Sequence, residues 1–205
     1  MTTYEVALPD VSDFDIVDAK QMIRSVLRDR RSKLTAKDLS KYAPAFAETI
    51  TEFVADAKTI AMYVSVKNEP DTYLALDTLS ELGVRILLPK LGPGLNRMWA
   101  EYECDDLVSE APGRPPSPKG DPLPAEVIEE ADVIIVPALA VNQSGTRLGQ
   151  GGGWYDRMLK QNVTDKVGAL IYPWEFVSNS LPYDEQDVRV PWVLQPGTIT
   201  KVEDN

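Results

Sequence analysis

Apolar runs of the length of a buried strand alternate with amphipathic helical patterns along most of this chain, and no other feature of the sequence restricts the fold as much. The Val-Ile-Ile-Val run at 133–136 is the clearest strand. Such alternation is typical of an α/β domain with a largely parallel, buried sheet. We expect strands over 59–66, 84–89, 95–103, 132–137, 167–172 and 193–202, and helices over 15–34, 36–54, 71–82, 125–130 and 155–161.

Capping and turn residues divide these elements. Thr35 and Asp38 match the capping box of a helix in which Pro44 predicts a break. Gly83 predicts the end of the next helix. The proline-rich segment 111–124 is expected to be extended or looped within the domain. With 205 residues, the chain fits a single domain over 15–205 that follows a tail over 1–14.

Composition excludes several kinds of site. The chain has a formal net charge of −11, 0 histidines and 1 cysteine, Cys104. Imidazole bases, histidine-dependent nucleophiles and multi-thiolate metal sites are therefore excluded, and a metal would need oxygen ligands, which favours magnesium or calcium. The acidic balance predicts no nucleic-acid or anionic-membrane partner. The chain has neither a secretory leader pattern nor a long apolar run, so we expect a cytoplasmic protein.

The segment Arg147-Leu-Gly-Gln-Gly-Gly-Gly-Trp-Tyr-Asp156 follows the clearest strand and leads into a predicted helix. Glycines allow backbone N–H groups to approach a bulky anion, and a helix N-terminus adds favourable partial charge. The segment is neither a Walker loop nor a dinucleotide fingerprint. It indicates either a phosphate-binding loop or a tight turn between helix and sheet.

A basic stripe, Lys20, Arg24, Arg28 and Arg31, falls on one side of the first predicted helix. These side chains could bind phosphate or carboxylate, or they could form a solvated face paired with nearby aspartates.

Three isolated carboxylates, Glu69, Asp156 and Asp187, stand beside loop signals. Oxygen-only magnesium sites beside substrate phosphates use one or two such groups, although most surface carboxylates have no such role. Trp154 and Tyr155 could stack on a planar ligand or simply pack.

Four blocks of the sequence, taken in order, form a recognisable pattern. The longest is Val136-Pro-Ala-Leu-Ala-Val-Asn-Gln-Ser-Gly-Thr-Arg-Leu-Gly-Gln-Gly-Gly-Gly-Trp-Tyr-Asp-Arg157. The others are Lys20-Gln-Met-Ile-Arg24, the run from Tyr63 through Glu69 to the strand ending at Pro89, and Leu181-Pro182 followed by Asp187. Together they resemble the 5-formyltetrahydrofolate cyclo-ligase (5,10-methenyltetrahydrofolate synthetase) family, and the resemblance covers about residues 19 to 195.

The resemblance implies an enzyme of one-carbon metabolism that converts 5-formyltetrahydrofolate to 5,10-methenyltetrahydrofolate with ATP and Mg²⁺ and releases ADP and phosphate. It also implies a three-layer α/β sandwich around a mainly parallel sheet, and we expect a monomer. The implied ATP-binding residues are Lys20, Arg24, Arg147, Leu148, Gly149, Gln150, Gly151, Gly152, Gly153, Trp154 and Tyr155. The implied folate-binding residues are Val64, Glu69, Gln150, Gly151, Gly152, Gly153 and Trp154, and the implied magnesium ligands are Asp156 and Asp187. No residue is expected to act as a covalent nucleophile.

The chain departs from the family pattern at several positions. Trp154 replaces the first tyrosine of a Tyr-Tyr-Asp motif, Phe176 stands where glutamine is common, and Gln186 replaces a frequent histidine. These changes leave open a non-catalytic relative that binds folate or nucleotide. A phosphosugar isomerase on a similar sheet is a third interpretation, and it would need neither ATP nor folate.

Overall fold

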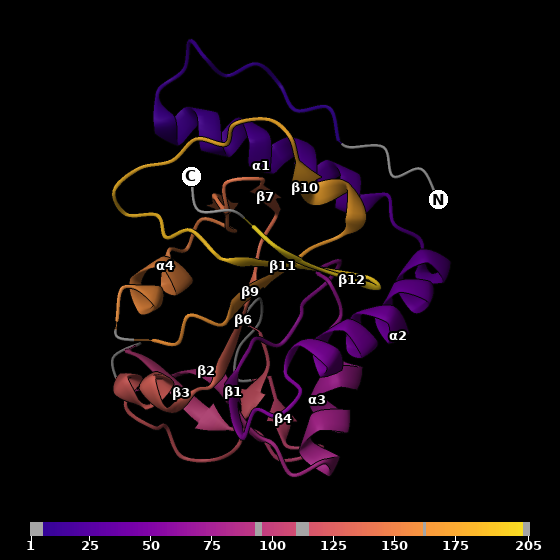
Figure 1. Cartoon of the computed structure of the whole chain (residues 1–205), viewed down its shortest axis with the longest axis vertical. Helices are drawn as coiled ribbons and strands as arrows, with labels where there is room; N and C mark the ends of the chain where they lie inside the picture. Colours follow the sequence, from indigo (N-terminus) through magenta and orange to yellow (C-terminus); the bar gives the residue numbers. More distant parts are fainter. Residues whose placement is uncertain (1–5, 93–95, 110–114, 162, 203–205) are drawn as a thin grey trace.

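The computed structural model describes residues 6–92, 96–109, 115–161 and 163–202, and its centre is a seven-stranded sheet in the order β12-β11-β9-β6-β1-β2-β3 (Figure 1). The five inner strands are parallel, and the two edge strands, β12 and β3, pair antiparallel. The prediction of an α/β fold with a mainly parallel sheet is therefore confirmed. The strands are β1 (Thr59–Ala61), β2 (Arg85–Leu91), β3 (Arg97–Glu101), β6 (Val133–Pro137), β9 (Val167–Leu170), β11 (Trp192–Gln195) and β12 (Thr198–Lys201).

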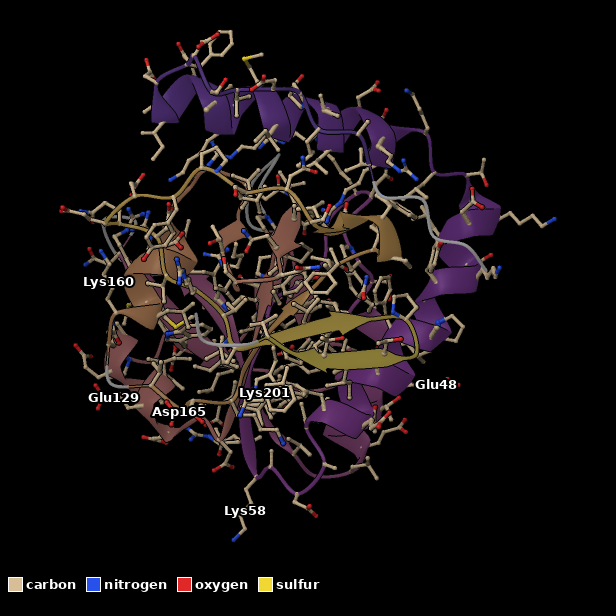
Figure 2. All side chains as sticks on the ribbon, turned by 45° about the horizontal axis from the view of Figure 1, so that its top comes forward. Glu48, Lys58, Glu129, Lys160, Asp165 and Lys201 are labelled. Carbon is tan, nitrogen blue, oxygen red and sulfur yellow. The ribbon has the colours of Figure 1, made fainter. Side chains whose placement is uncertain are left out.

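The two faces of the sheet carry separate apolar clusters, because successive strand residues point to opposite sides. Ile60 and Ile135 face α1 (Ile16–Ser32), α2 (Ala36–Phe53) and α3 (Tyr73–Glu81). Ala61 and Ile134 face α4 (Trp154–Leu159) and the 3₁₀ helix η2 (Ala125–Glu130). Helices thus cover both faces, as a three-layer sandwich requires, while charged side chains such as Lys58, Glu129 and Asp165 point outward (Figure 2).

Short strands outside the main sheet complete the fold. β7 (Ala140–Asn142) pairs with β8 (Arg147–Leu148) and with β10 (Phe176–Val177), which follows the 3₁₀ helix η3 (Pro173–Glu175). β4 (Leu107–Val108) pairs with β5 (Ser117–Pro118), and the rest of the described part of the proline-rich segment is mainly loop, in agreement with the prediction of extended or looped structure. Residues 111–114 of that segment, residues 1–5 of the predicted tail and residue 95 of a predicted strand lie outside the described residues.

Some of the helix boundaries predicted from capping and turn residues are confirmed, and one is wrong. The capping box of Thr35 and Asp38 and the stop at Gly83, where φ is +78°, are confirmed. The predicted break at Pro44 is wrong: α2 continues through it. A proline removes only one helical N–H, and the buried face of α2, including Phe46 and Ile50, packs on the core on the C-terminal side of Pro44.

Two strand predictions differ most from the observed strands. The strand expected over 193–202 is a hairpin that turns at Gly197, where φ is +73°. The strand expected over 59–66 ends at Ala61, although the N–H of Met62 still donates to the Leu87 carbonyl. Residues 62–65 remain buried, so their apolar character reflects burial outside the sheet. Among the described residues, no helix is long and apolar enough to cross a bilayer.

Helix α1 is attached to the core by a buried ion pair. Arg31 Nε donates to Glu175 Oε1 at 2.7 Å, and Nη2 donates to Oε2 at 2.8 Å and to the Ala138 carbonyl at 2.6 Å. The side chains of Arg31 and Glu175 are 5% and 0% exposed. Burial raises the pKa of Glu175, and the charge of Arg31 opposes that shift. The pair therefore depends on both partners being present.

We expect Glu175→Gln to lower the free energy of unfolding by about 3 to 5 kcal/mol, because it leaves the guanidinium of Arg31 buried without a counter-charge. Urea denaturation would measure the change. Asp29→Asn is the control, since its ion pair with Lys33 is exposed and its loss should change stability by less than about 1 kcal/mol. Equal effects of the two substitutions would contradict the structural role of the buried pair.

Candidate active site

A cavity of about 1040 Å³ opens at the carboxyl ends of the parallel strands. From β1 the chain continues to β2 on one side of the sheet, whereas β6 and the later parallel strands lie on the other side. Such a reversal separates the loops that follow adjacent strands and leaves a crevice between them. Val64 after β1, Pro89 near the end of β2 and Pro137 at the end of β6 all line the cavity.

The glycine-rich segment forms one wall of this cavity. Gly151 and Gly153 have φ values of +104° and +60°, which side chains other than glycine rarely adopt. Arg24 Nε donates to the Gly149 carbonyl at 2.9 Å, and Arg28 Nη2 donates to the Gln150 carbonyl at 2.7 Å. Two arginines of α1 therefore hold the loop by its backbone, and α4 begins directly after it.

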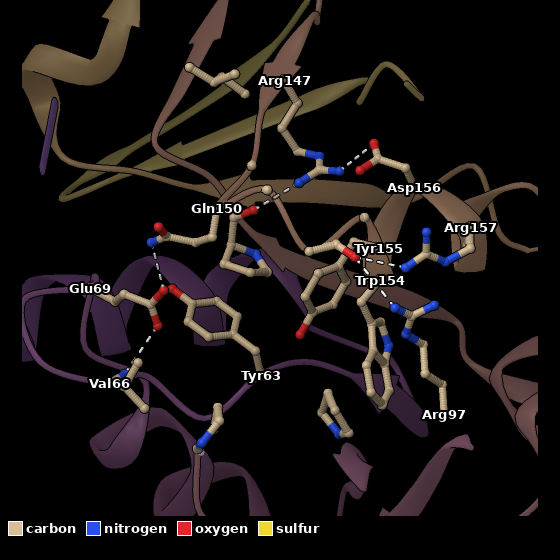
Figure 3. Close-up of a pocket in the computed structure, with 18 of the residues that line it drawn as sticks. Tyr63, Val66, Glu69, Arg97, Arg147, Gln150, Trp154, Tyr155, Asp156 and Arg157 are labelled. Atoms are coloured by element: carbon tan, nitrogen blue, oxygen red, sulfur yellow. Dashed lines mark hydrogen bonds and ion pairs between the residues drawn. The ribbon is translucent and has the colours of Figure 1, made fainter. Parts of the chain in front are cut away.

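Arg147 and Asp156 form an ion pair at one side of the cavity (Figure 3). Arg147 Nη2 donates to Asp156 Oδ1 at 2.6 Å, and Nη1 donates to the Pro137 carbonyl at 3.1 Å. The Nε–H of Arg147 is buried and has no hydrogen-bond partner within the described part of the chain. A buried donor of this kind is costly unless a ligand uses it, so it supports an anion site here.

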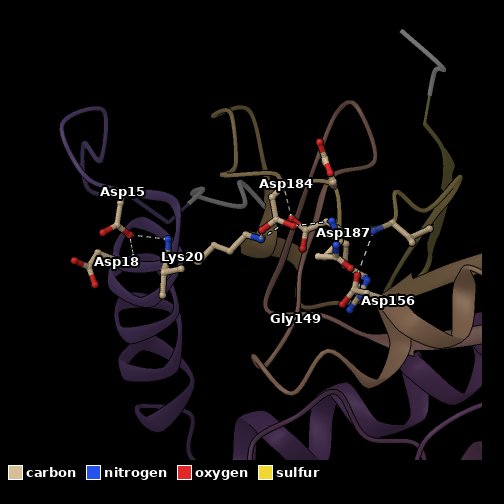
Figure 4. Close-up of polar contacts among 12 residues, drawn as sticks. Asp15, Asp18, Lys20, Gly149, Asp156, Asp184 and Asp187 are labelled. Atoms are coloured by element: carbon tan, nitrogen blue, oxygen red, sulfur yellow. Dashed lines mark hydrogen bonds and ion pairs between the residues drawn. The ribbon is translucent and has the colours of Figure 1, made fainter.

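Lys20 joins α1 to a loop near the C-terminus (Figure 4). Its Nζ donates to Asp184 Oδ2 at 2.6 Å and to Asp187 Oδ2 at 2.5 Å. Burial opposes protonation of Lys20, but these hydrogen bonds raise its pKa above the ordinary value. The same contact with Lys20 lowers the pKa of Asp184. The ammonium group of Lys20 and the carboxylate of Asp184 are therefore both charged at neutral pH.

Glu69 lies on another wall of the cavity. Its Oε2 accepts from the N–H of Val66 at 3.1 Å, and its Oε1 accepts from Gln150 Nε2 at 3.0 Å. Burial raises the pKa of Glu69, and these hydrogen bonds oppose that shift. Burial also raises the pKa of the neighbouring Tyr63, whose hydroxyl donates to the Pro70 carbonyl. This wall combines aromatic surface with one oriented carboxylate.

Every site residue predicted from the sequence lines this one cavity, although their individual roles stay predictions. They are Lys20, Arg24, Val64, Glu69, Arg147, Leu148, Gly149, Gln150, Gly151, Gly152, Gly153, Trp154, Tyr155, Asp156 and Asp187. Of the rest of the basic stripe, Arg28 binds the glycine loop and Arg31 is structural.

Other cavity residues were not predicted from the sequence. Asp184 stands three residues before Asp187, a spacing that could have drawn attention to a paired carboxylate. Arg97 and Arg157 also line the cavity, but the sequence gives no signal that β3 and α4 meet there.

The sequence pattern of the 5-formyltetrahydrofolate cyclo-ligase family matches residues 16–196. The chain belongs to this family. The predicted enzyme class, a ligase acting on folate in one-carbon metabolism, is confirmed by this match. The interpretation as a phosphosugar isomerase is accordingly set aside.

Named relatives and solved structures agree with this assignment. A 5-formyltetrahydrofolate cyclo-ligase of Mycolicibacterium smegmatis is 38% identical over 87% of this chain and 94% of its own length. One from Escherichia coli is 28% identical over 85% of this chain and 98% of its own length. The structure of Aquifex aeolicus 5,10-methenyltetrahydrofolate synthetase has a TM-score of 0.73 at 23% identity, with 91% of this chain and 94% of that chain covered, and it supports the fold alone.

We expect Gly151→Ala to lower the free energy of unfolding by about 1 to 2 kcal/mol, because a side chain strains the backbone at a φ of +104°. Gly152→Ala is the matched control, since its φ is not positive and an added Cβ meets no atom within 4 Å. Thermal denaturation of both variants would measure the difference. An effect at Gly152 as large as that at Gly151 would contradict the loop conformation.

Proposed function

We propose that this chain binds ATP and Mg²⁺ beside 5-formyltetrahydrofolate in the cavity and closes the folate ring to give 5,10-methenyltetrahydrofolate, ADP and phosphate. The observation that carries the proposal is the meeting of the basic side chains of α1, the glycine-rich loop and two isolated aspartates in one cavity. That combination suits a phosphate chain, and the aromatic wall next to it suits a flat heterocycle.

The triphosphate would lie against the glycine-rich loop. Its N–H groups, the α4 N-terminus and the free Nε–H of Arg147 offer hydrogen-bond donors there. Lys20 and Arg24 add positive charge from α1. Because Lys20 is paired with Asp184 and Asp187, the phosphate oxygens would take over its ammonium group and leave Asp187 available.

Asp156 and Asp187 fit a magnesium ion that is shared with the nucleotide. Asp156 Oδ2 and Asp187 Oδ1 accept no hydrogen bond from the described residues, and both side chains line the cavity. The described residues include no group of three or more acidic, histidine or cysteine side chains that could hold a metal. Magnesium commonly combines one or two carboxylates with substrate phosphates and water. When bound, it would neutralise charge on the phosphate chain and keep it aligned.

The folate would lie between Glu69 and Trp154. Glu69 is oriented by Val66 and Gln150, so it can accept hydrogen bonds from the pterin. Trp154 is held by an edge-to-face contact with Trp99, with ring centroids 6.4 Å apart. A fixed indole ring offers a stacking surface for the aromatic part of the substrate.

The reaction then needs alignment more than a protein nucleophile. The formyl oxygen on N5 attacks the γ-phosphorus of ATP, and the bond to the bridging oxygen of ADP breaks. N10 next attacks the activated formyl carbon, the phosphate group leaves with the former formyl oxygen, and N10 loses its proton. Placing the formyl oxygen, the γ-phosphate and N10 within one enclosed site supplies most of the acceleration. The chain has 0 histidines, and this route needs none.

The test is a spectroscopic assay of the purified chain with ATP, Mg²⁺ and 5-formyltetrahydrofolate. We expect the methenyl absorbance to appear only when all three are present, together with one ADP for each methenyl group. Folate or nucleotide binding without ADP release would instead favour the non-catalytic relative. The monomeric state and the cytoplasmic location stay predictions, and a relative from Arabidopsis thaliana is named as mitochondrial.

We expect Asp187→Asn to raise the magnesium concentration for half-maximal turnover by about tenfold, because it removes one negative charge from the proposed metal site. A magnesium titration of the assay would measure the change. Asp165→Asn is the control, since Asp165 is exposed and does not line the cavity. A titration that is unchanged in Asp187→Asn would exclude this residue as a ligand.

A further inference from the structure

Two arginines that the proposed reaction does not use converge on the cavity beside Trp154. Arg97 lies in β3 and Arg157 in α4, 60 positions later in the sequence. Both donate to the Gly152 carbonyl, Arg97 Nη2 at 3.4 Å and Arg157 Nη2 at 2.7 Å. Figure 3 shows both guanidinium groups next to Trp154 and apart from the Arg147–Asp156 pair.

Within the part of the chain that the structure describes, the two arginines carry positive charge without a counter-charge. Neither forms an ion pair with a carboxylate of the described residues, whereas Arg85 in the neighbouring strand β2 pairs with Glu101 and Glu130. Burial and then the charge of Arg157 lower the pKa of Arg97. In a chain with a net charge of −11, two adjacent cations that share only a carbonyl oxygen form a local site for an anion.

The position of the two arginines beside Trp154 indicates which anion they would bind. The guanidinium carbon of Arg97 lies 5.5 Å from the centroid of the Trp154 ring. In 5-formyltetrahydrofolate the pterin is followed by an aminobenzoyl ring and then by glutamate, which carries two carboxylates. If the aromatic part stacks on Trp154, the glutamate end comes within reach of both arginines. In the proposed function, a separate group of cations binds the phosphates of the nucleotide, namely Lys20, Arg24 and Arg147.

We propose that Arg97 and Arg157 form a carboxylate subsite that binds the glutamate end of the folate substrate and thereby sets its affinity. The proposal rests on the proposed function, since it assumes that the folate occupies the wall at Trp154. Arginine suits the task, because its planar fork matches a carboxylate and stays charged. The subsite affects binding of the substrate and not the reacting atoms.

The test compares two substrates, 5-formyltetrahydrofolate and 5-formyltetrahydropteroate, which lacks the glutamate. Steady-state kinetics at saturating ATP and Mg²⁺ are measured for the wild type, Arg97→Gln, Arg157→Gln and the double variant. Arg85→Gln is the control, since it removes an arginine that already has carboxylate partners outside the cavity. We expect each cavity variant to raise the KM for the glutamate-bearing substrate about fivefold, with kcat within about twofold.

The pteroate is expected to have the same KM in all five proteins, and the KM for ATP should not change. An equal rise for both substrates would mean that the arginines only hold the Gly152 carbonyl, and it would overturn the proposal. A rise in the KM for ATP, or no change with either substrate, would overturn it as well. Failure of the wild type to convert either substrate would instead count against the proposed reaction, and with it this subsite.

Discussion

The basic stripe of α1 is the interaction on which the rest of the site depends. Four side chains, spaced so that they share one side of the helix, reach three separate parts of the molecule. Lys20 contacts the 184–187 loop, Arg24 and Arg28 bind the carbonyls of the glycine-rich loop, and Arg31 pairs with Glu175 in the core. The buried pair fixes the helix, so that Lys20 and Arg24 line the cavity and Arg28 holds the glycine-rich loop. Residues that stabilise the fold and residues proposed to bind the nucleotide thus lie on successive turns of one helix.

The layers of the fold could be predicted because a strand buried on both faces leaves a continuous apolar run. The ends of the strands could not be predicted, since an apolar residue indicates burial and not hydrogen bonding to a neighbouring strand. Residues 62–65 are buried beyond the end of β1, and the run at 193–202 conceals a turn at Gly197. The single helix through Pro44 has a similar cause, because core packing outweighs the loss of one hydrogen bond.

The candidate site was predictable where its residues lie close together in the sequence or belong to the family pattern, as in the glycine-rich loop. Contacts between residues that are far apart in the sequence could not be predicted. Nothing in the sequence near Lys20 indicates that it pairs with Asp184 and Asp187, or that Gln150 reaches Glu69. The approach of Arg97 to Arg157 likewise depends on how the edge strand β3 packs beside the loop.

The ion pairs of Lys20 also bear on the order in which ligands arrive. In the free protein the Lys20 ammonium group contacts the carboxylate of Asp187, so a bare divalent cation that approached Asp187 would meet electrostatic repulsion. An incoming polyanion would draw the ammonium group away and bring its own counter-ion. With Asp187 as a metal ligand, as proposed above, Lys20 would therefore favour a metal that arrives with the nucleotide over the bare metal ion, without movement of a domain.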